Sequence, residues 1–372
     1  MQRIFHTPEG VRDIYSQECS RKQKLQEKLH RVFHQYGFED IETPTFEYFE
    51  VFSKEVGTIP SRDLYKFFDR EGNTLVLRPD FTPSVSRACA TYFNPEKEVV
   101  SLCYTGNTFI NNSSFRGRLK ETTQMGVERM GDDSPEADAE ILAMTVECLL
   151  ATGLTEFQVS VGQVDYYKAI FAQTGLSQEE EEELRELISQ KNYFGVEDLV
   201  RSQNIPESLE KAFLELPHLF GSSEVLQKAR SLTDNICAIK AVERLEEIYE
   251  ILKIYGYEKY VSFDFGMLSK FQYYTGIIFQ AYTYGTGEPV VKGGRYNNLL
   301  KHFGKPAASI GFGITVDNLL MALSRQKISL PEKKAPVILT YTEANRREAI
   351  LEAQKLRNEG TAVALRREKE DC

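Results

Sequence analysis

The chain has 372 residues, enough to bury a large core and to form more than one domain. Its 45 basic and 55 acidic side chains give a formal net charge of −10, which argues against a broad nucleic-acid-binding surface but leaves room for a local basic patch. No apolar run approaches the roughly 18 residues of a membrane span, no signal-peptide core is present, and the six cysteines form no CxxC pair, so we expect a cytoplasmic protein with free thiols.

The first predicted elements are an amphipathic helix and a short extended segment. Apolar residues recur on one face of residues 16–36, and Gly37 is a natural stop for this helix. Residues 38–44 then look extended, and Pro44 limits strand pairing to an edge or an interface.

Two histidines, His30 and His34, lie one turn apart on this helix and off its apolar stripe. We find no carboxylate at a sequence spacing that would complete a metal site. The sequence therefore predicts a solvated helix face and no metal site.

The middle of the chain alternates strands with helices. Residues 102–111 and 119–130 are predicted to be paired strands around a polar loop. Ser134 and Pro135 indicate the start of a helix, with an N-cap followed by proline in the first turn. Residues 157–161 alternate as a strand, and the pattern from about 165 to 253 is helical and locally polar.

The last part of the chain contains further strands over 259–265, 277–284 and 309–314, and a helix over 316–325. Hairpins interrupted by long helical segments favour an α+β fold with an antiparallel sheet flanked by helices. Residues 331–372 follow as a short βαβ unit, which is too small to bury much surface alone and should pack on the body or on another chain.

Three segments resemble the motifs of histidyl-tRNA synthetase, a class II aminoacyl-tRNA synthetase. Residues 106–128 resemble motif 2 without gaps, 269–276 resemble the histidine-specific motif, and 311–318 resemble motif 3. In that family each motif supplies an arginine for amino-acid activation. The equivalent positions here are Ile110, Ser269 and Asn318, which cannot grip a phosphate as a guanidinium does.

The resemblance implies how the chain is organised. It predicts a class II synthetase-like domain over residues 1–325, with a helical insertion at about 165–253. It also predicts that 331–372 are a truncated counterpart of the anticodon-binding domain. Residues 38–44 resemble the strand of motif 1, which implies a self-dimer.

The resemblance also implies a pocket for histidine that has largely been kept. The implied contacts to the amino group are Asp80, Thr82 and Gln124, those to the imidazole are Glu128 and Tyr274, and Tyr273, Gly293 and Gly294 form the pocket wall. A carboxylate and a phenol are suitable partners for the two ring nitrogens. The basic loop with Arg116, Arg118 and Lys120 is either a solvated turn or a contact for an anion.

A histidine pocket without its phosphate-binding arginines indicates a regulatory protein. The chain resembles the regulatory subunits of ATP phosphoribosyltransferase. This resemblance implies no catalytic residues, no cofactor and no tRNA charging. It implies a hetero-octamer with a short-form catalytic subunit, which the chain activates and makes sensitive to L-histidine in the first step of histidine biosynthesis.

Two alternatives remain. The chain could be an active histidyl-tRNA synthetase or another synthetase-like amino-acid sensor. The sequence also leaves open whether regulatory histidine binds in the pocket or at the interface with the partner.

Overall fold

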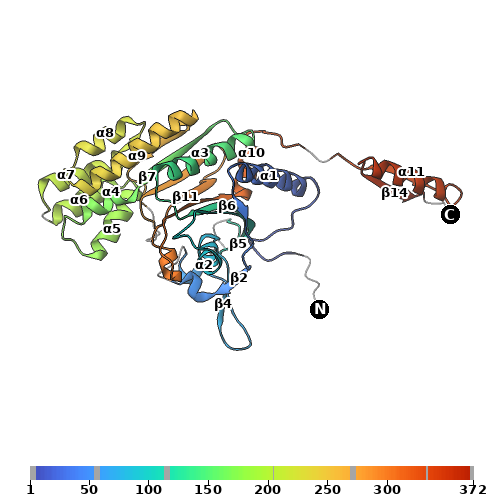
Figure 1. Ribbon diagram of the computed structural model, residues 1–372, viewed down its shortest axis with the longest axis horizontal. Helices are drawn as coiled ribbons and strands as arrows, with labels where there is room; N and C mark the ends of the chain where they lie inside the picture. Colours follow the sequence, from blue (N-terminus) through green and yellow to red (C-terminus); the bar gives the residue numbers. More distant parts are fainter. Residues whose placement is uncertain are drawn as a thin grey trace. The chain divides into compact units, whose positions relative to one another are not determined.

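The computed structural model describes residues 6–53, 59–112, 118–203, 205–268, 274–331 and 334–368 (Figure 1). Contacts divide the chain into two compact units. The larger unit contains residues 22–330 together with those before 14, and the smaller one contains residues 14–21 and those from 331 onward.

The larger unit is built on a mixed sheet of nine strands in the order β1-β5-β6-β12-β11-β10-β7-β9-β8. Its strands, in that order, are Glu39–Asp40, Val100–Phe109, Glu121–Met130, Ser309–Thr315, Val291–Arg295, Ile277–Thr283, Phe157–Gln163, Val261–Asp264 and Phe220–Gly221. The six strands from β5 to β7 pair antiparallel, as predicted. Parallel pairs of β1 with β5 and of β7 with β9 make the complete sheet mixed.

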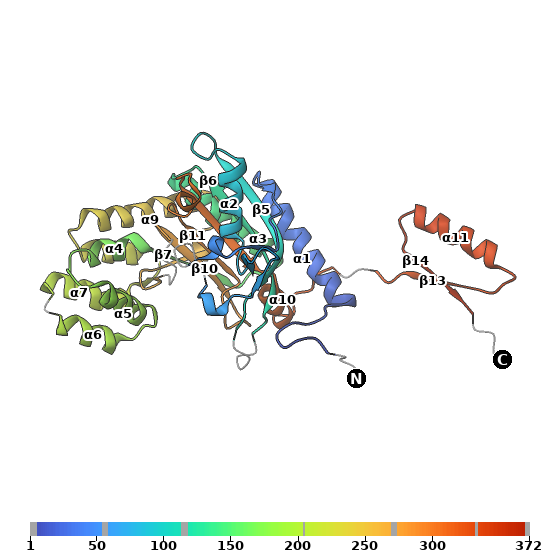
Figure 2. The same ribbon diagram turned by 90° about the horizontal axis from the view of Figure 1, so that it is seen from below.

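Helices cover both faces of this sheet (Figure 1). Helices α1 (Ser16–Gln35), α3 (Pro135–Ala151) and α10 (Val316–Arg325) lie on one face, and their apolar residues form the largest core cluster together with Val127 and Phe312 of the sheet. Helix α2 (Thr82–Tyr92) lies on the other face, where a smaller cluster includes Phe81, Tyr104 and Tyr296 (Figure 2). We call the first the core face and the second the α2 face.

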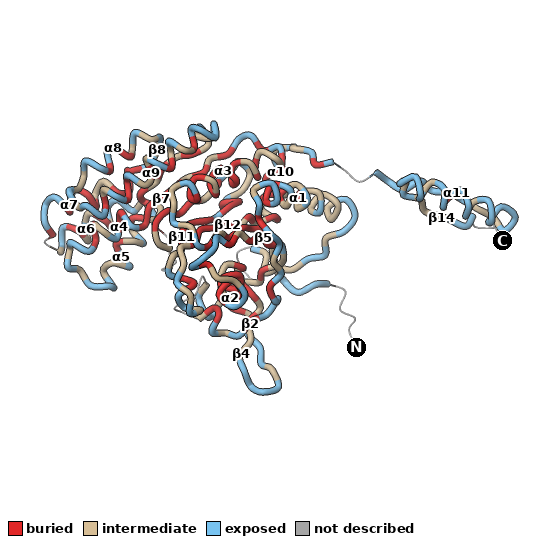
Figure 3. The backbone as a smooth tube through the Cα atoms, in the orientation of Figure 1, coloured by how far each residue is buried: buried red, intermediate tan, exposed pale blue. Residues whose placement is uncertain are grey.

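The predicted helical insertion is a group of helices beside β7. These helices are α4 (Val164–Phe171), α5 (Gln178–Ser189), α6 (Tyr193–Ser202), α7 (Glu207–Glu215), α8 (Glu224–Ser231) and α9 (Ile236–Tyr255). Helix α9 packs on α3 and α4, so the insertion shares the largest core cluster with the sheet (Figure 3).

Two smaller sheets complete the fold. Strands β2 (Phe46–Tyr48), β4 (Thr74–Leu77) and β3 (Lys66–Phe68) pair antiparallel in that order. In the smaller unit, β13 (Val337–Tyr341) and β14 (Val363–Arg367) pair in parallel around α11 (Arg346–Asn358), which confirms the predicted βαβ arrangement. Apolar side chains of β13 and α11 are exposed to solvent, and those of β14 are partly exposed. In α11, Ala353 is buried.

Most predicted elements are present, and the structure differs from the predictions in two places. Ser134 caps α3 through its hydroxyl, which accepts a hydrogen bond from the Ala137 amide, and Pro135 begins the helix. The segment 38–44 contains a strand of only two residues, Glu39–Asp40, at the sheet edge. Strand β11, which contains Gly293 and Gly294 and lies in the middle of the sheet, was not among the predicted strands.

Candidate functional site

The α2 face of the sheet has a floor of glycines. Glu128 of β6 pairs with Gly311 of β12, and Gly311 pairs with Gly294 of β11, so these three residues form one row across three strands. Residues paired in this way point to the same face of a sheet. A side chain at Gly311 would overlap the Glu128 carboxylate, and one at Gly294 would overlap the Tyr274 ring. The glycines therefore allow Glu128 and Tyr274 to occupy the same row.

The Glu128 carboxyl group is buried and held at both oxygens. The side chain is 1% exposed. Thr82, at the start of α2, donates a hydrogen bond of 2.7 Å to Oε1, and the Tyr296 hydroxyl donates a short hydrogen bond to Oε2. The Tyr104 hydroxyl is also buried beside this group, where it interacts with Thr82 and Glu128.

Burial controls the charge of this site. It raises the pKa of Glu128 to about 8, although the hydrogen bonds from Thr82 and Tyr296 favour the ionised form, and the Asp80 carboxylate raises it further. Burial also raises the pKa of Asp80, which the hydrogen bond from Gln124 only partly offsets. Two carboxyl groups with raised pKa values in one place are typical of a functional site, because stability alone gives no reason to bury them.

Asp80 and Gln124 form the second part of the site. Gln124 Nε2 donates to Asp80 Oδ1 at 3.1 Å, and the Phe81 amide donates to the same oxygen at 2.8 Å. Gln124 lies on β6 four residues before Glu128, and its amide group extends over Gly313 of β12. The structure therefore brings Asp80, Thr82, Gln124 and Glu128 together on the α2 face, with the Tyr274 ring in the same row.

The two glycines assigned to the pocket wall lie on opposite faces. Gly294 is on the α2 face, under Tyr274. Gly293 is on the core face, where a side chain would overlap the Phe279 ring. Only Gly294 of this pair therefore remains in the candidate site. Tyr273 lies outside the described residues.

Tyr296 and the buried ion pairs beside it were not predicted from the sequence. Arg295 Nη2 lies 2.6 Å from Asp138 Oδ1, and Arg244 Nη2 lies 2.7 Å from Asp138 Oδ2. These contacts join β11 to α3 and to α9 of the insertion, and they fix the backbone that leads into Tyr296. Tyr296 lies two positions after Gly294, with Arg295 between them, and this proximity to the two glycines was the available signal in the sequence.

Two of the three positions that correspond to the phosphate-binding arginines of the family lie at the ends of elements. Ile110 directly follows β5, and its amide donates to the Lys120 carbonyl at 2.9 Å. Asn318 lies in the first turn of α10, next to Asp317, which accepts from Lys22 at 3.0 Å. Ser269 lies outside the described residues.

The basic loop is described only in part. Arg118 forms an ion pair with Glu288, so this arginine has an acidic partner within the chain. The Lys120 amide donates to the Gly10 carbonyl at 2.7 Å. Arg116 lies outside the described residues, and the loop's contact with an anion stays a prediction.

Comparisons with known proteins agree with this architecture. The family model for histidyl-tRNA synthetase matches residues 10–319. The crystal structure titled as an ATP phosphoribosyltransferase regulatory subunit/histidyl-tRNA synthetase from Bacillus halodurans is 32% identical, with a TM-score of 0.89 over 99% of this chain and 94% of that one. Histidyl-tRNA synthetase from Nostoc sp. PCC 7120, at 21% identity and a TM-score of 0.82, covers 100% of this chain and 88% of its own and shares the fold.

Two similar proteins of known family indicate which family within this fold the chain resembles. The ATP phosphoribosyltransferase regulatory subunit of Acetivibrio thermocellus is 41% identical over 97% of this chain and 86% of the relative. That of Ruminiclostridium cellulolyticum is 38% identical over 96% and 86%.

The fold and the cluster around Glu128 therefore define a protein of the histidyl-tRNA synthetase class. Within this class, the chain belongs to the ATP phosphoribosyltransferase regulatory subunit family. Its role is regulatory and not catalytic, and it belongs to histidine biosynthesis. Among the described residues, no helix combines the length and apolarity needed to cross a membrane.

Proposed function

We propose that this chain assembles with a short-form ATP phosphoribosyltransferase catalytic subunit in a hetero-octamer, activates that subunit, and makes it sensitive to feedback inhibition by L-histidine. The names of its relatives support a catalytic partner. Isoleucine and asparagine at positions 110 and 318 support the absence of amino-acid activation and tRNA charging by this chain, because neither side chain carries the charge that a phosphate requires.

The proposed histidine site is the cluster on the α2 face. The observation that carries this proposal is the row in which the Glu128 carboxyl group lies over Gly311 and the Tyr274 ring lies over Gly294. A carboxyl group and a phenol brought close together in this way are suitable partners for the two nitrogens of an imidazole ring. Tyr104 offers a further buried hydroxyl to the same ligand.

The amino group of histidine is proposed to bind beside Asp80, Thr82 and Gln124. The hydrogen bond between Gln124 and Asp80 and the one between Thr82 and Glu128 already hold these side chains in place. Such preorganisation lowers the cost of ordering side chains on binding. The ammonium group of the ligand would also balance the charge of the two neighbouring carboxyl groups.

Regulation then follows from linkage. Histidine bound here lowers the partner's activity only if it favours one state of the assembly, and the partner must in turn change the affinity for histidine by the same factor. We propose that residues 38–44 contribute to a self-dimer and that the βαβ unit of β13, α11 and β14 contributes to contact with the catalytic subunit. The exposed Ile338 and Leu351 of that unit offer apolar surface for such contact.

Calorimetry with L-histidine tests the site. Glu128→Gln removes the titratable carboxyl group and keeps the shape, and we expect binding to weaken by roughly tenfold or more, because the imidazole loses its proton-sharing partner. Glu121→Gln, on the same strand and bonded to Asn107, is the matched control and should bind normally. Unchanged affinity in Glu128→Gln would move the histidine site elsewhere, with the partner interface as the next place to examine.

Mixing experiments test the partner. Combined with a short-form catalytic subunit, the chain should form a large complex on a sizing column and raise the partner's rate, and histidine should lower that rate again. Separate elution with an unchanged rate would refute the assembly, whatever the α2 face binds.

A further inference from the structure

A second cluster of ligating side chains lies at the other face of the sheet, near its β1 edge. It consists of His30 and His34 of α1, Asp40 of β1 and Cys103 of β5. Asp40 pairs with Cys103 in the sheet, so both side chains point to the core face, on which α1 packs. From the sequence, no carboxylate was expected to complete a metal site at these histidines. The structure corrects this expectation. The chain turns back at Gly37, so the Asp40 carboxylate contacts both histidine rings.

We propose that His30, His34, Asp40 and Cys103 form a binding site for one divalent transition-metal cation, with Zn²⁺ as the best match. The ligating atoms of all four residues lie within 4.8 Å of one another. Both histidines present Nε2 to the same carboxylate, at 2.5 Å for His30 and 3.0 Å for His34. The Cys103 thiol lies 3.4 Å from Asp40 Oδ1.

The set of donors favours zinc over harder cations. Two imidazoles, a thiolate and a carboxylate are the ligand types of tetrahedral zinc sites, with bonds of about 2.0–2.3 Å. Magnesium and calcium prefer oxygen ligands, of which this cluster offers only Asp40. Two histidines one turn apart on a helix are a recurring pair of zinc ligands. Four protein ligands fill a tetrahedral shell, which indicates a structural site and not a catalytic one.

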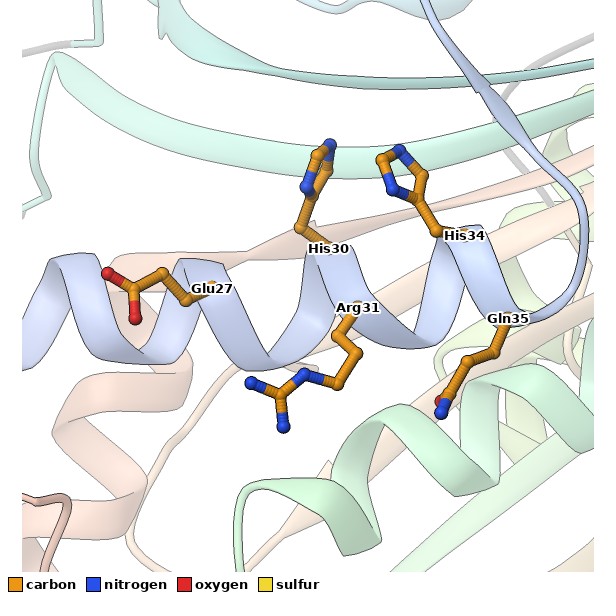
Figure 4. A pocket seen from close by; sticks show the side chains of 5 residues that line it. All are labelled: Glu27, His30, Arg31, His34 and Gln35. Atoms are coloured by element: carbon orange, nitrogen blue, oxygen red, sulfur yellow. The ribbon is translucent and has the colours of Figure 1, made fainter.

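Charge and access are also compatible with a cation. An ionised Asp40 and a Cys103 thiolate together neutralise a 2+ ion. A cation binds the Cys103 sulfur as a thiolate, so binding must release the thiol proton. The side chains of His30 and His34 are 38% and 47% exposed and line an open surface depression with Glu27, Arg31 and Gln35. Figure 4 shows both rings on the same side of α1, away from Arg31 and Gln35.

Titration of the chelator-treated full chain with Co²⁺, a spectroscopic substitute for Zn²⁺, tests the proposal. We expect one equivalent to bind with a thiolate-to-cobalt charge-transfer band and the visible spectrum of tetrahedral cobalt, and Zn²⁺ to displace it. His34→Gln changes an exposed side chain and should weaken metal binding on the order of 100-fold or more. Mutating a residue that only supports a metal ligand already lowers metal affinity by about 10–100-fold. Cys103→Ala should abolish the charge-transfer band.

His302→Gln and Cys237→Ser change an exposed histidine and an exposed cysteine outside the cluster, so they are the matched controls and should bind like the parent chain. If Cys103→Ala does not fold, circular dichroism will show it. The proposal is then tested by cobalt binding to His34→Gln and by the charge-transfer band of the parent chain. Binding without that band, or binding that His34→Gln leaves unchanged, would overturn the proposal. Equal loss of binding in His302→Gln would do the same.

Discussion

The Tyr296 hydroxyl donates a hydrogen bond to Glu128, although the two residues are separated by 168 positions in the chain. They meet because β12 lies between β6 and β11 and contributes only Gly311 at this point. The contact links the end of β11 to the centre of the candidate site. It also explains how a buried carboxyl group is tolerated on the sheet, because both of its oxygens accept hydrogen bonds.

Tyr296→Phe removes this hydrogen bond and keeps the ring. We expect the free energy of unfolding to fall by about 1 kcal/mol and histidine binding to weaken, because the ionised form of Glu128 loses a hydrogen-bond donor. Urea denaturation and calorimetry measure the two effects. A variant with unchanged affinity would show that Tyr296 does not help to position Glu128.

Glu128→Gln should change how stability depends on pH. Unfolded, Glu128 titrates near 4.5, and folded its pKa is about 8, so above pH 4.5 the folded state holds more protons than the unfolded state. Stability is therefore highest below the unfolded pKa and declines as pH rises through the folded pKa. The variant lacks this decline, so its Tm should exceed that of the parent chain at about pH 8.5 and approach it near pH 5.

At high pH, the free energy of unfolding of Glu128→Gln should exceed that of the parent chain by on the order of 2–4 kcal/mol. This figure follows from about 1.4 kcal/mol per pKa unit, reduced by a cost for imperfect hydrogen bonds to the amide. Thermal melts across this range measure it. A constant difference between the two proteins would mean that the Glu128 pKa is not raised.

If histidine binds beside Glu128, its affinity should pass through a maximum with pH. The complex holds one proton between the imidazole and the carboxyl group. Free histidine gains a proton below about pH 6.5, and free Glu128 loses one above a pKa of about 8. Both changes oppose the complex, so affinity should be greatest between these values and should fall on either side. Calorimetry at a series of pH values measures the profile, and an affinity that rises steadily to high pH would exclude this arrangement.

The ion pairs at Asp138 should respond unequally to mutation. Asp138→Asn leaves the guanidinium groups of Arg295 and Arg244 with only the exposed Asp133 carboxylate, which pairs with Arg295, as a counter-charge, and should destabilise the chain by about 3–5 kcal/mol. Arg244→Met leaves the Arg295 pair intact, and should cost about 1–3 kcal/mol. Chemical denaturation measures both, and equal losses would contradict this order.

Ile110→Arg should not create an enzyme. The purified parent chain and this variant should both show no histidine-dependent exchange of pyrophosphate into ATP and no tRNA charging, since the other two positions still lack a guanidinium. An active histidyl-tRNA synthetase assayed in parallel is the control. Exchange by the parent chain that Glu128→Gln abolishes would show that amino-acid activation has been retained.

Local patterns predicted local structure well. Ser134 and Pro135 located the start of α3, and the apolar stripe of α1 is buried at Leu25, Leu29 and Phe33. Strand β11 was not predicted because glycine is a poor strand former. Gly293 and Gly294 are accommodated there because the Phe279 ring fills the space beside Gly293 and the Tyr274 ring fills the space beside Gly294.

Contacts between distant residues could not be predicted in the same way. The residues of the α2 face were proposed from family resemblance, and no sequence pattern pairs Tyr296 with Glu128 or joins Asp138 to two arginines. The cluster of His30, His34 and Asp40 was missed for a related reason. Its spacing becomes meaningful only when α1 packs on the sheet beside Cys103.

The glycine floor on the α2 face has a consequence for selectivity. The Glu128 carboxyl group covers Gly311 and the Tyr274 ring covers Gly294, so the glycines make room for these two side chains and offer a ligand no polar group of their own. In the proposed site, discrimination among amino acids must therefore arise at the carboxyl group and the phenol. A ligand ring without nitrogens, such as that of phenylalanine, would enter beside these polar groups and form no hydrogen bond with them.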